Sequence, residues 1–288
     1  MSLAGLYFND SFKKSILRGN KPYIVFGPTG TGKTNFAIKL AKEIDAEIIN
    51  CDMAQIYSEI RVGVGQIKEK EQQEIPHYLF GFLKTPDLFS VYQMRIEIEL
   101  KIKFILSKNK NVIIVGGSSF LVYSLFFAPS LYYDNLFYKD SFFYGLNKTK
   151  HFVFGNSQEN KKKDFIVFLP IYDYTVIFFD IEYSAKDMWL DKIKERIDCF
   201  LEEGWIEEIK AMGQDWIDFL SNKKFIGYNE LILYIENKNN FEYDLFDIKD
   251  KIFFRTAQYG KKQRTFLRKM KRDFLIYNVL CVDHYIKI

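Results

Sequence analysis

The stretch Tyr23-Ile-Val-Phe-Gly-Pro-Thr-Gly-Thr-Gly-Lys-Thr34 gives the clearest indication of the fold, because it joins a short apolar run to a glycine-rich turn. The apolar residues Tyr23–Phe26 favour a strand, and the amphipathic segment Lys33–Ile44 after the turn favours a helix. The turn, residues 27–34, satisfies the pattern GxxxxGK[ST] at every position. Strand, turn and helix together form the context of a phosphate-binding P-loop, which we favour over a turn that only connects two elements.

The residues of this loop predict how it binds phosphate. Glycines let successive backbone N–H groups converge on an anion at a helix N-terminus, where the helix dipole adds to the attraction. We expect Lys33 to reach the outer phosphates and the Thr34 hydroxyl to ligate Mg²⁺. The predicted phosphate-binding residues are Gly27, Pro28, Thr29, Gly30, Thr31, Gly32, Lys33 and Thr34. The motif predicts a bound di- or triphosphate without indicating which one.

Further segments extend the pattern of alternating strands and helices. Residues 47–50, 111–115 and 175–179 are continuous apolar runs, typical of strands in a parallel sheet covered on both faces. Residues 91–107 have an ambiguous period, but their length and the need for a crossover favour a helix. Residues 185–212 and 247–273 predict helices, with a break at Gly204. The predicted fold class is α/β: a P-loop NTPase-like core with a mostly parallel sheet, a small insertion domain and C-terminal helices.

The predicted domain organisation has four parts. Residues 1–20 form an N-terminal extension, and residues 21–125 the first part of the P-loop core. Residues 126–174 form a reduced insertion or substrate region, because the regular pattern gives way there to aromatic and solvated stretches. Residues 175–288 complete the core and add the C-terminal helices.

Composition limits the class of protein. A chain of 288 residues can bury a sizeable core without disulfides or metals. Its three cysteines match neither a zinc ribbon nor a disulfide framework. The N-terminus lacks a signal-peptide pattern, and no apolar stretch reaches the length of a membrane helix. We therefore expect a monomeric protein of the cytoplasm that does not associate with membranes. The net charge of +4 is mild, so any preference for nucleic acid depends on where the charges lie.

Two aspartates are candidates for chemistry. An ordinary P-loop hydrolase has a strand ending in a metal-binding Asp, whereas the strand at 111–115 ends in Gly116-Gly117. Asp180 is a weaker candidate for that role, because it equally begins a loop, and a hydrolase is therefore not favoured. Asp52 follows the strand at 47–50, which places it at the carboxyl end of the sheet, where ligands bind. A carboxylate there can accept a proton; alternatively, Asp52 caps a following helix.

The segment Ile49-Asn-Cys-Asp-Met-Ala-Gln-Ile-Tyr57 resembles the part of tRNA dimethylallyltransferases in which an Asp is followed by a Gln and a Tyr. The resemblance continues in order and spacing over residues 21–124 and 183–272. The similar segments are Val62-Gly63, Ile75-Pro-His-Tyr-Leu79, Pro86 with Phe89-Ser-Val91, Val115-Gly-Gly-Ser118, Arg196-Ile-Asp198, Glu203-Gly-Trp-Ile-Glu-Glu208, Gly227-Tyr-Asn-Glu-Leu231 and TAQYGKKQRTFLR at 256–268.

The resemblance implies transfer of a dimethylallyl group, with Mg²⁺, from dimethylallyl diphosphate to the exocyclic amine of the adenosine beside the anticodon in tRNA. It implies Asp52 as general base and Thr29 and Lys33 as further catalytic residues, with Thr34 on the metal. The tRNA anticodon stem-loop would contact Asp52, Met53, Ala54, Gln55, Ser118, Lys261, Lys262, Gln263 and Arg264. The same helix carries Arg268, Lys269, Lys271 and Arg272, a density that favours RNA over a merely solvated face.

Three departures from the family pattern leave alternatives open. Asn229 and Ala257 stand where the family usually has basic residues, and Lys224 or Arg255 are candidates to replace them. The insertion is short and rich in aromatic residues. Two roles are open for its rings: stacking on RNA bases, or packing in the protein core. These rings are Tyr132, Tyr133, Phe137, Tyr138, Phe142, Phe143 and Tyr144. The alternatives are an adenylate isopentenyltransferase acting on free AMP or ATP, and a noncatalytic RNA-binding relic.

Overall fold

The computed structural model describes residues 22–127, 174–182, 184–237, 244–276 and 284–287. The predicted N-terminal extension, nearly all of the predicted insertion with its aromatic residues, and Cys281 lie outside the described residues. None of the helices in the described ranges has both the length and the apolar character needed to cross a membrane.

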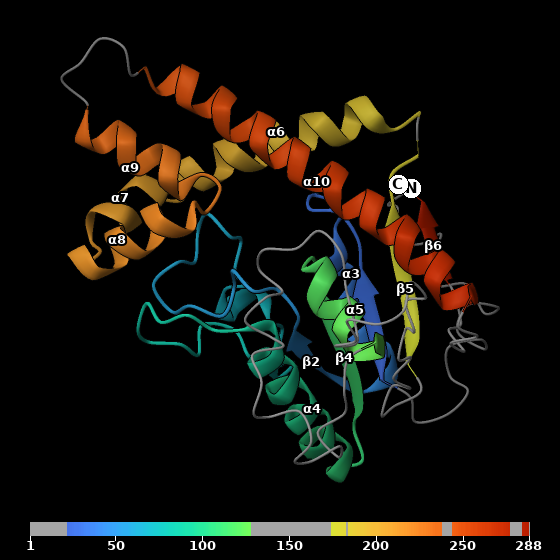
Figure 1. The fold of residues 1–288 in the computed structure, drawn as a ribbon. Helices are drawn as coiled ribbons and strands as arrows, with labels where there is room; N and C mark the ends of the chain where they lie inside the picture. Colours follow the sequence, from blue (N-terminus) through green and yellow to red (C-terminus); the bar gives the residue numbers. More distant parts are fainter. Residues whose placement is uncertain (1–21, 128–173, 183, 238–243, 277–283, 288) are drawn as a thin grey trace, which may run out of the picture.

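A six-stranded sheet forms the centre of the molecule, in the order β3-β2-β4-β1-β5-β6 (Figure 1). Every strand pairs in parallel with its neighbours. The strands are β1 (Tyr23–Phe26), β2 (Ala46–Asn50), β3 (His77–Tyr78), β4 (Asn111–Gly116), β5 (Thr175–Asp180) and β6 (His284–Lys287). The four predicted strands and the mostly parallel sheet are confirmed; the short strands β3 and β6 were not predicted.

The sheet is covered on both faces because its strands are apolar on both sides. On β1, Tyr23 and Val25 pack into a cluster with α3 (Lys33–Ile44). Ile24 and Phe26 face the other way, into a larger cluster with α4 (Val91–Ser107) and α5 (Ser119–Phe127). The predicted helices at 33–44 and 91–107 are confirmed. Burying each such large apolar side chain contributes about 1.5 to 3 kcal/mol, so the alternating faces of β1 fix α3 on one side.

The C-terminal helices form a second layer above the carboxyl end of the sheet. They are α6 (Lys186–Glu202), α7 (Trp205–Lys210), α8 (Gln214–Lys223), α9 (Tyr228–Glu236) and α10 (Leu245–Ile276), and a short 3-10 helix, η1 (Glu69–Glu71), precedes β3. Gly204 separates α6 from α7 with a φ of 91°, as predicted. In Figure 1, α10 runs from the cluster of α7, α8 and α9 past α6 to the sheet.

The segments before and after residues 128–173 share this one sheet. β5 follows the predicted insertion in the chain, yet it pairs with β1 from Tyr23 opposite Thr175 to Phe26 opposite Phe178. The P-loop after β1 and the loop after β5 therefore both lie at the carboxyl end of the sheet, beneath α6 and α10.

Candidate active site at the carboxyl end of the sheet

The P-loop adopts the conformation that its glycines permit. Gly30 and Gly32 have φ values of 75° and 82°, in the left-handed region that residues with a Cβ rarely adopt. Gly32 directly precedes α3, so the loop ends at the N-terminus of that helix. The Thr31 hydroxyl closes the turn by donating to the carbonyl of Pro28 over 2.8 Å. The loop thus presents backbone N–H groups and a helix dipole to an incoming anion.

Lys33 points back across this loop. Its Nζ donates to the carbonyl of Pro28 over 2.5 Å. The pKa of Lys33 is lowered to about 7, mainly by burial; the Asp52 charge opposes this shift, and the Arg196 charge adds a smaller lowering effect. Burial is the largest cause of the shift, and it penalises the charged form of Lys33. The environment of Lys33 therefore favours the binding of a negatively charged partner.

Asp52 is fixed by the residues around it. The side chain of buried Asn50 accepts from the Asp52 N–H over 2.9 Å and donates to the carbonyls of Asp52 and Leu79. The Asp52 carboxylate accepts from the N–H of Ala54 over 3.0 Å. This contact closes a turn and no helix begins directly after it, so the hypothesis that Asp52 caps a helix is wrong.

The ionisation of Asp52 suits a proton acceptor. Burial raises its pKa, and the Ala54 N–H, the Lys33 charge, the Gly117 N–H and the Arg196 charge oppose that rise. The net shift is upward, which makes the carboxylate a stronger base than an exposed aspartate while the two cations help it to stay charged.

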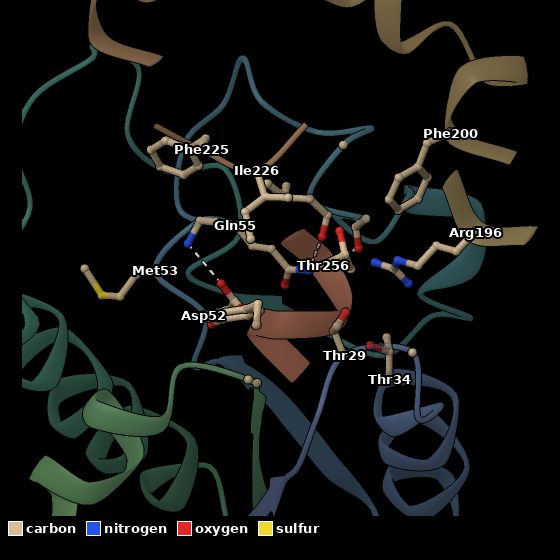
Figure 2. A pocket seen from close by; sticks show the side chains of 18 of the residues that line it. Thr29, Thr34, Asp52, Met53, Gln55, Arg196, Phe200, Phe225, Ile226 and Thr256 are labelled. Carbon is tan, nitrogen blue, oxygen red and sulfur yellow. Dashed lines mark hydrogen bonds between the residues drawn. The ribbon is translucent and has the colours of Figure 1, made fainter. Parts of the chain in front are cut away.

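A cavity of about 590 Å³ joins the P-loop to Asp52. In Figure 2, Asp52 and Arg196 approach it from opposite sides, above Thr29 and Thr34. Apolar and aromatic side chains form much of the remaining wall. They include Val64, Phe80, Phe89, Ile193, Phe200, Trp205, Phe219, Phe225 and Ile226. The cavity therefore combines an anion site, a base and an apolar lining.

Arg196 is a site residue that sequence reasoning had matched only as part of a family segment. It lies on α6, and burial lowers its pKa while the charges of Asp52 and Glu203 raise it. Its charge also affects Lys33 and Asp52, so it adds a third ionised group to the cavity. The available signal was its helical spacing from Trp189, seven residues earlier, which places both side chains on one face.

Several residues predicted to bind RNA have partners within the protein. Ser118 accepts from the N–H of Met53 over 2.9 Å. The Gln55 amide donates to the carbonyls of Val64 and Gly65 over 3.0 and 3.1 Å. Met53, Ala54 and Gln55 nevertheless line the cavity. These partners show that the segment after Asp52 is built into the wall of the site.

The four residues predicted on α10 divide into two pairs. Lys261 and Lys262 are exposed. Gln263 is buried and contacts the P-loop and the end of β4. Arg264 forms an ion pair with Asp180, with Nε 2.7 Å from Oδ1, and also donates to the carbonyl of Ile181. Asp180 is therefore engaged in an ion pair and does not line the cavity, which speaks against a metal role.

Two of the three departures from the family pattern, Asn229 and Ala257, lie outside the cavity wall. Arg255, one candidate replacement, is engaged with Glu230 and with the carbonyl of Lys224. Lys224 is exposed and lines the cavity together with Lys223. Of the two candidates, Lys224 is therefore the one placed to contribute positive charge.

The side chains at the site fit a metal ion that is coordinated mainly by the phosphate oxygens of a bound substrate. In the ranges that the structure describes, no group of three or more His, Cys, Asp or Glu side chains could hold a metal ion. Mg²⁺ commonly uses one or two protein ligands and completes its shell with phosphate oxygens and water. Thr34 lines the cavity beside Lys33 and offers one such oxygen.

A P-loop, an adjacent carboxylate and an apolar cavity together define a group-transfer site for a phosphorylated substrate. The model of isopentenyl transferases matches residues 20–155, and the model of IPP transferases matches residues 146–270. The two matches together span nearly all of the core. The chain therefore belongs to the IPP transferase family of tRNA dimethylallyltransferases.

Relatives and solved structures agree with this assignment. The chain is 28% identical over 277 residues to a tRNA dimethylallyltransferase of Phytoplasma australiense, covering 88% of this chain and 90% of the relative. It is 28% identical to one of Staphylococcus aureus, covering 89% and 93%. Its fold is similar to the tRNA isopentenylpyrophosphate transferase of Bacillus halodurans, with a TM-score of 0.66 at 20% identity, covering 93% and 90%. It is also similar to a eukaryotic dimethylallyltransferase acting on tRNA, with a TM-score of 0.66 at 18% identity, covering 92% and 74%.

Proposed function

We propose that this protein transfers a dimethylallyl group from dimethylallyl diphosphate to the exocyclic amine of the adenosine beside the anticodon in tRNA. The observation that carries the proposal is that the P-loop and the Asp52 carboxylate open into the same cavity. Membership of the family supports the donor and the acceptor. Among the described residues, Cys51 and Cys199 are free thiols, which supports the further proposal that the protein acts in the reducing cytoplasm.

The diphosphate of the donor is proposed to occupy the P-loop. Backbone N–H groups of residues 27–34 would bind its oxygens at the N-terminus of α3. Lys33 and Arg196 both contribute charge to this end of the cavity. Thr34 would hold Mg²⁺, which neutralises diphosphate charge when bound. Charge neutralisation makes diphosphate a good leaving group, so binding and departure depend on the same residues.

The apolar wall and Asp52 complete the reaction. The apolar residues in the wall of the same cavity offer a surface to the prenyl chain. As the adenine nitrogen forms its bond to the first carbon of the prenyl group, the bond from that carbon to the diphosphate oxygen breaks, and its electron pair leaves with the diphosphate. The proton of the amine passes to Asp52, whose raised pKa favours accepting it. The Thr29 hydroxyl is proposed to contact the bridging end of the diphosphate.

RNA is proposed to approach along α10. The exposed residues Lys261 and Lys262 follow Tyr259, which lines the cavity, so a strand whose base enters the cavity has its phosphates near these lysines. We propose that Met53, Ala54 and Gln55 contact the entering nucleotide from the wall. Gln263 and Arg264 would act mainly by holding α10 against the core.

The test is direct product analysis. Purified protein is incubated with dimethylallyl diphosphate and Mg²⁺, in parallel with unmodified tRNA and with AMP, and the nucleosides are identified by mass spectrometry. We expect prenylated adenosine from the tRNA reaction alone. Product from AMP alone would instead identify an adenylate isopentenyltransferase, and absence of product from both would identify a noncatalytic protein.

A further inference from the structure

The backbone of Thr29 is held from two sides by side chains distant in sequence. Its N–H donates to Oε1 of Gln263 on α10 over 2.9 Å. Its carbonyl accepts from Nε1 of Trp189 on α6, also over 2.9 Å. Trp189 is 4% exposed and Gln263 is 3% exposed. Both side chains are therefore buried, whereas Thr29 is half-buried at the cavity, and breaking either hydrogen bond leaves a buried or half-buried polar group without its partner.

Trp189 fits closely between the P-loop and α10. A methyl group placed on Gly260 of α10 would come within 2.5 Å of Cζ2 of Trp189, and one on Gly30 would lie 3.5 Å from Nε1. The indole therefore fills a space bounded by two glycines. Trp189 is not among the residues that line the cavity. Any effect it has on a substrate must pass through residues that do line it.

Two residues of the cavity wall depend on the position of Trp189. Thr29 is hydrogen-bonded to it directly. Arg196 lies seven residues later on α6, two helical turns away on the same face, with Ile193 between them in the cavity wall. The hydrogen bond thus anchors α6 against the P-loop and sets the point at which Arg196 enters the cavity.

We infer that Trp189 is a positioning residue for prenyl transfer: its indole N–H fixes the Thr29 backbone and the placement of α6, and so aligns Thr29 and Arg196 on the diphosphate. The inference rests on the proposed function for its reaction, but the alignment itself concerns the binding of a diphosphate. A purely structural tryptophan would require only the ring, because packing does not use the N–H group.

The experiment replaces the N–H while retaining an aromatic ring. Trp189→Phe is compared with Trp216→Phe, which makes the same chemical change at a residue that is 6% exposed and lies outside the cavity wall. We expect Trp189→Phe to lower kcat by about 10-fold, since one partly buried hydrogen bond is lost from the aligned state. The KM for tRNA should stay at the wild-type value, and the Tm should fall no more than in Trp216→Phe. Equal kcat values for the two variants, or a loss of kcat only in proportion to Tm, would overturn the inference.

A second measurement does not depend on catalysis. Binding of inorganic diphosphate with Mg²⁺ is measured by calorimetry for wild type, Trp189→Phe, Arg196→Gln and the double variant. If Trp189 acts partly through Arg196, Trp189→Phe should weaken binding less in the Arg196→Gln background than in wild type. Equal losses in both backgrounds, or no loss from Trp189→Phe in either, would contradict a positioning role. Failure of wild-type protein to prenylate tRNA, with this coupling intact, would overturn the proposed function alone.

Discussion

Asp52 and Lys33 face one cavity, and each charge opposes the effect of burial on the other. The Lys33 ammonium restrains the burial-driven rise in the pKa of Asp52, and the Asp52 carboxylate restrains the fall in the pKa of Lys33. Burial is the largest cause of both shifts. The site without ligand therefore holds a carboxylate that readily takes a proton and an ammonium that readily loses one.

The shifted pKa of Lys33 predicts a pH dependence of diphosphate binding. With a pKa of about 7, Lys33 is charged below that pH and loses its proton above it. A bound diphosphate favours the charged form, so binding above pH 7 requires proton uptake by Lys33. Affinity should then fall by up to about tenfold per pH unit from this group alone. Below pH 7 the group should have little effect.

Calorimetry at pH 8 in buffers of different ionisation enthalpy measures this proton uptake with inorganic diphosphate and Mg²⁺. Lys33→Arg is the control, because its guanidinium stays charged throughout this range. We expect less proton uptake in Lys33→Arg than in wild type. Equal uptake by the two proteins would assign it to the diphosphate and not to Lys33.

The raised pKa of Asp52 predicts that the site lowers the stability of the fold. A carboxyl group with a folded-state pKa above its unfolded value contributes stability at low pH, and this contribution is lost as pH rises through the folded-state pKa. Asp52→Asn should therefore raise the Tm relative to wild type at pH 8, and the advantage should shrink at acidic pH. Thermal unfolding across this range checks the sign. A Tm below that of wild type at pH 8 would mean that the charged carboxylate is a net stabiliser.

Arg196 is expected to act on the leaving diphosphate. Arg196→Gln removes a charge that both Asp52 and Lys33 sense. Loss of one charged hydrogen bond costs about 1.5 to 3 kcal/mol, or about one to two decades in kcat if it acts in the transition state. Steady-state kinetics should show this loss in kcat/KM for the donor, with partial recovery in Arg196→Lys. Lys194→Gln, on an exposed position of the same helix, is the control; a similar loss there would show a general effect of charge on α6.

The exposed lysines of α10 are expected to determine the salt dependence of RNA binding. Replacing Lys261 and Lys262 with glutamine should weaken tRNA binding and reduce the salt slope by about 0.7 to 0.9 for each phosphate that is no longer neutralised. Fluorescence titration at several salt concentrations measures the slope. Replacing Lys39 and Lys42, exposed on α3, removes equal charge from another surface. If both double variants change the slope equally, net charge and not α10 is responsible.

The sequence predicted those elements of the fold that have a motif or a periodic apolar pattern of their own. The helix at 33–44 was found because the P-loop fixes its start and its apolar spacing marks its buried face. The two-residue strand β3 was not predicted because a pairing of Ile48 with His77 carries no periodic pattern of its own. Asp52 was placed correctly because it directly follows a buried strand.

Residues brought to the site by tertiary packing were harder to predict. Arg196 and Trp189 lie far along the chain from the P-loop, and only the packing of α6 over the sheet brings them to it. Gln263 was assigned to RNA binding by resemblance, whereas its contacts with Thr29 and Gly117 are visible only in three dimensions. Sequence reasoning named Arg196 and Gln263 but could not show their partners, and it did not single out Trp189.

Prenyl transfer by Asp52 variants tests whether this carboxylate is the base of the reaction. A single turnover of wild-type protein is compared with Asp52→Ala and Asp52→Asn, using dimethylallyl diphosphate, Mg²⁺ and unmodified tRNA, while tRNA affinity is measured on the same preparations. We expect both variants to bind tRNA but to yield no prenylated adenosine. Prenyl transfer at the wild-type rate by either variant would contradict the assignment of Asp52 as the base that receives the proton.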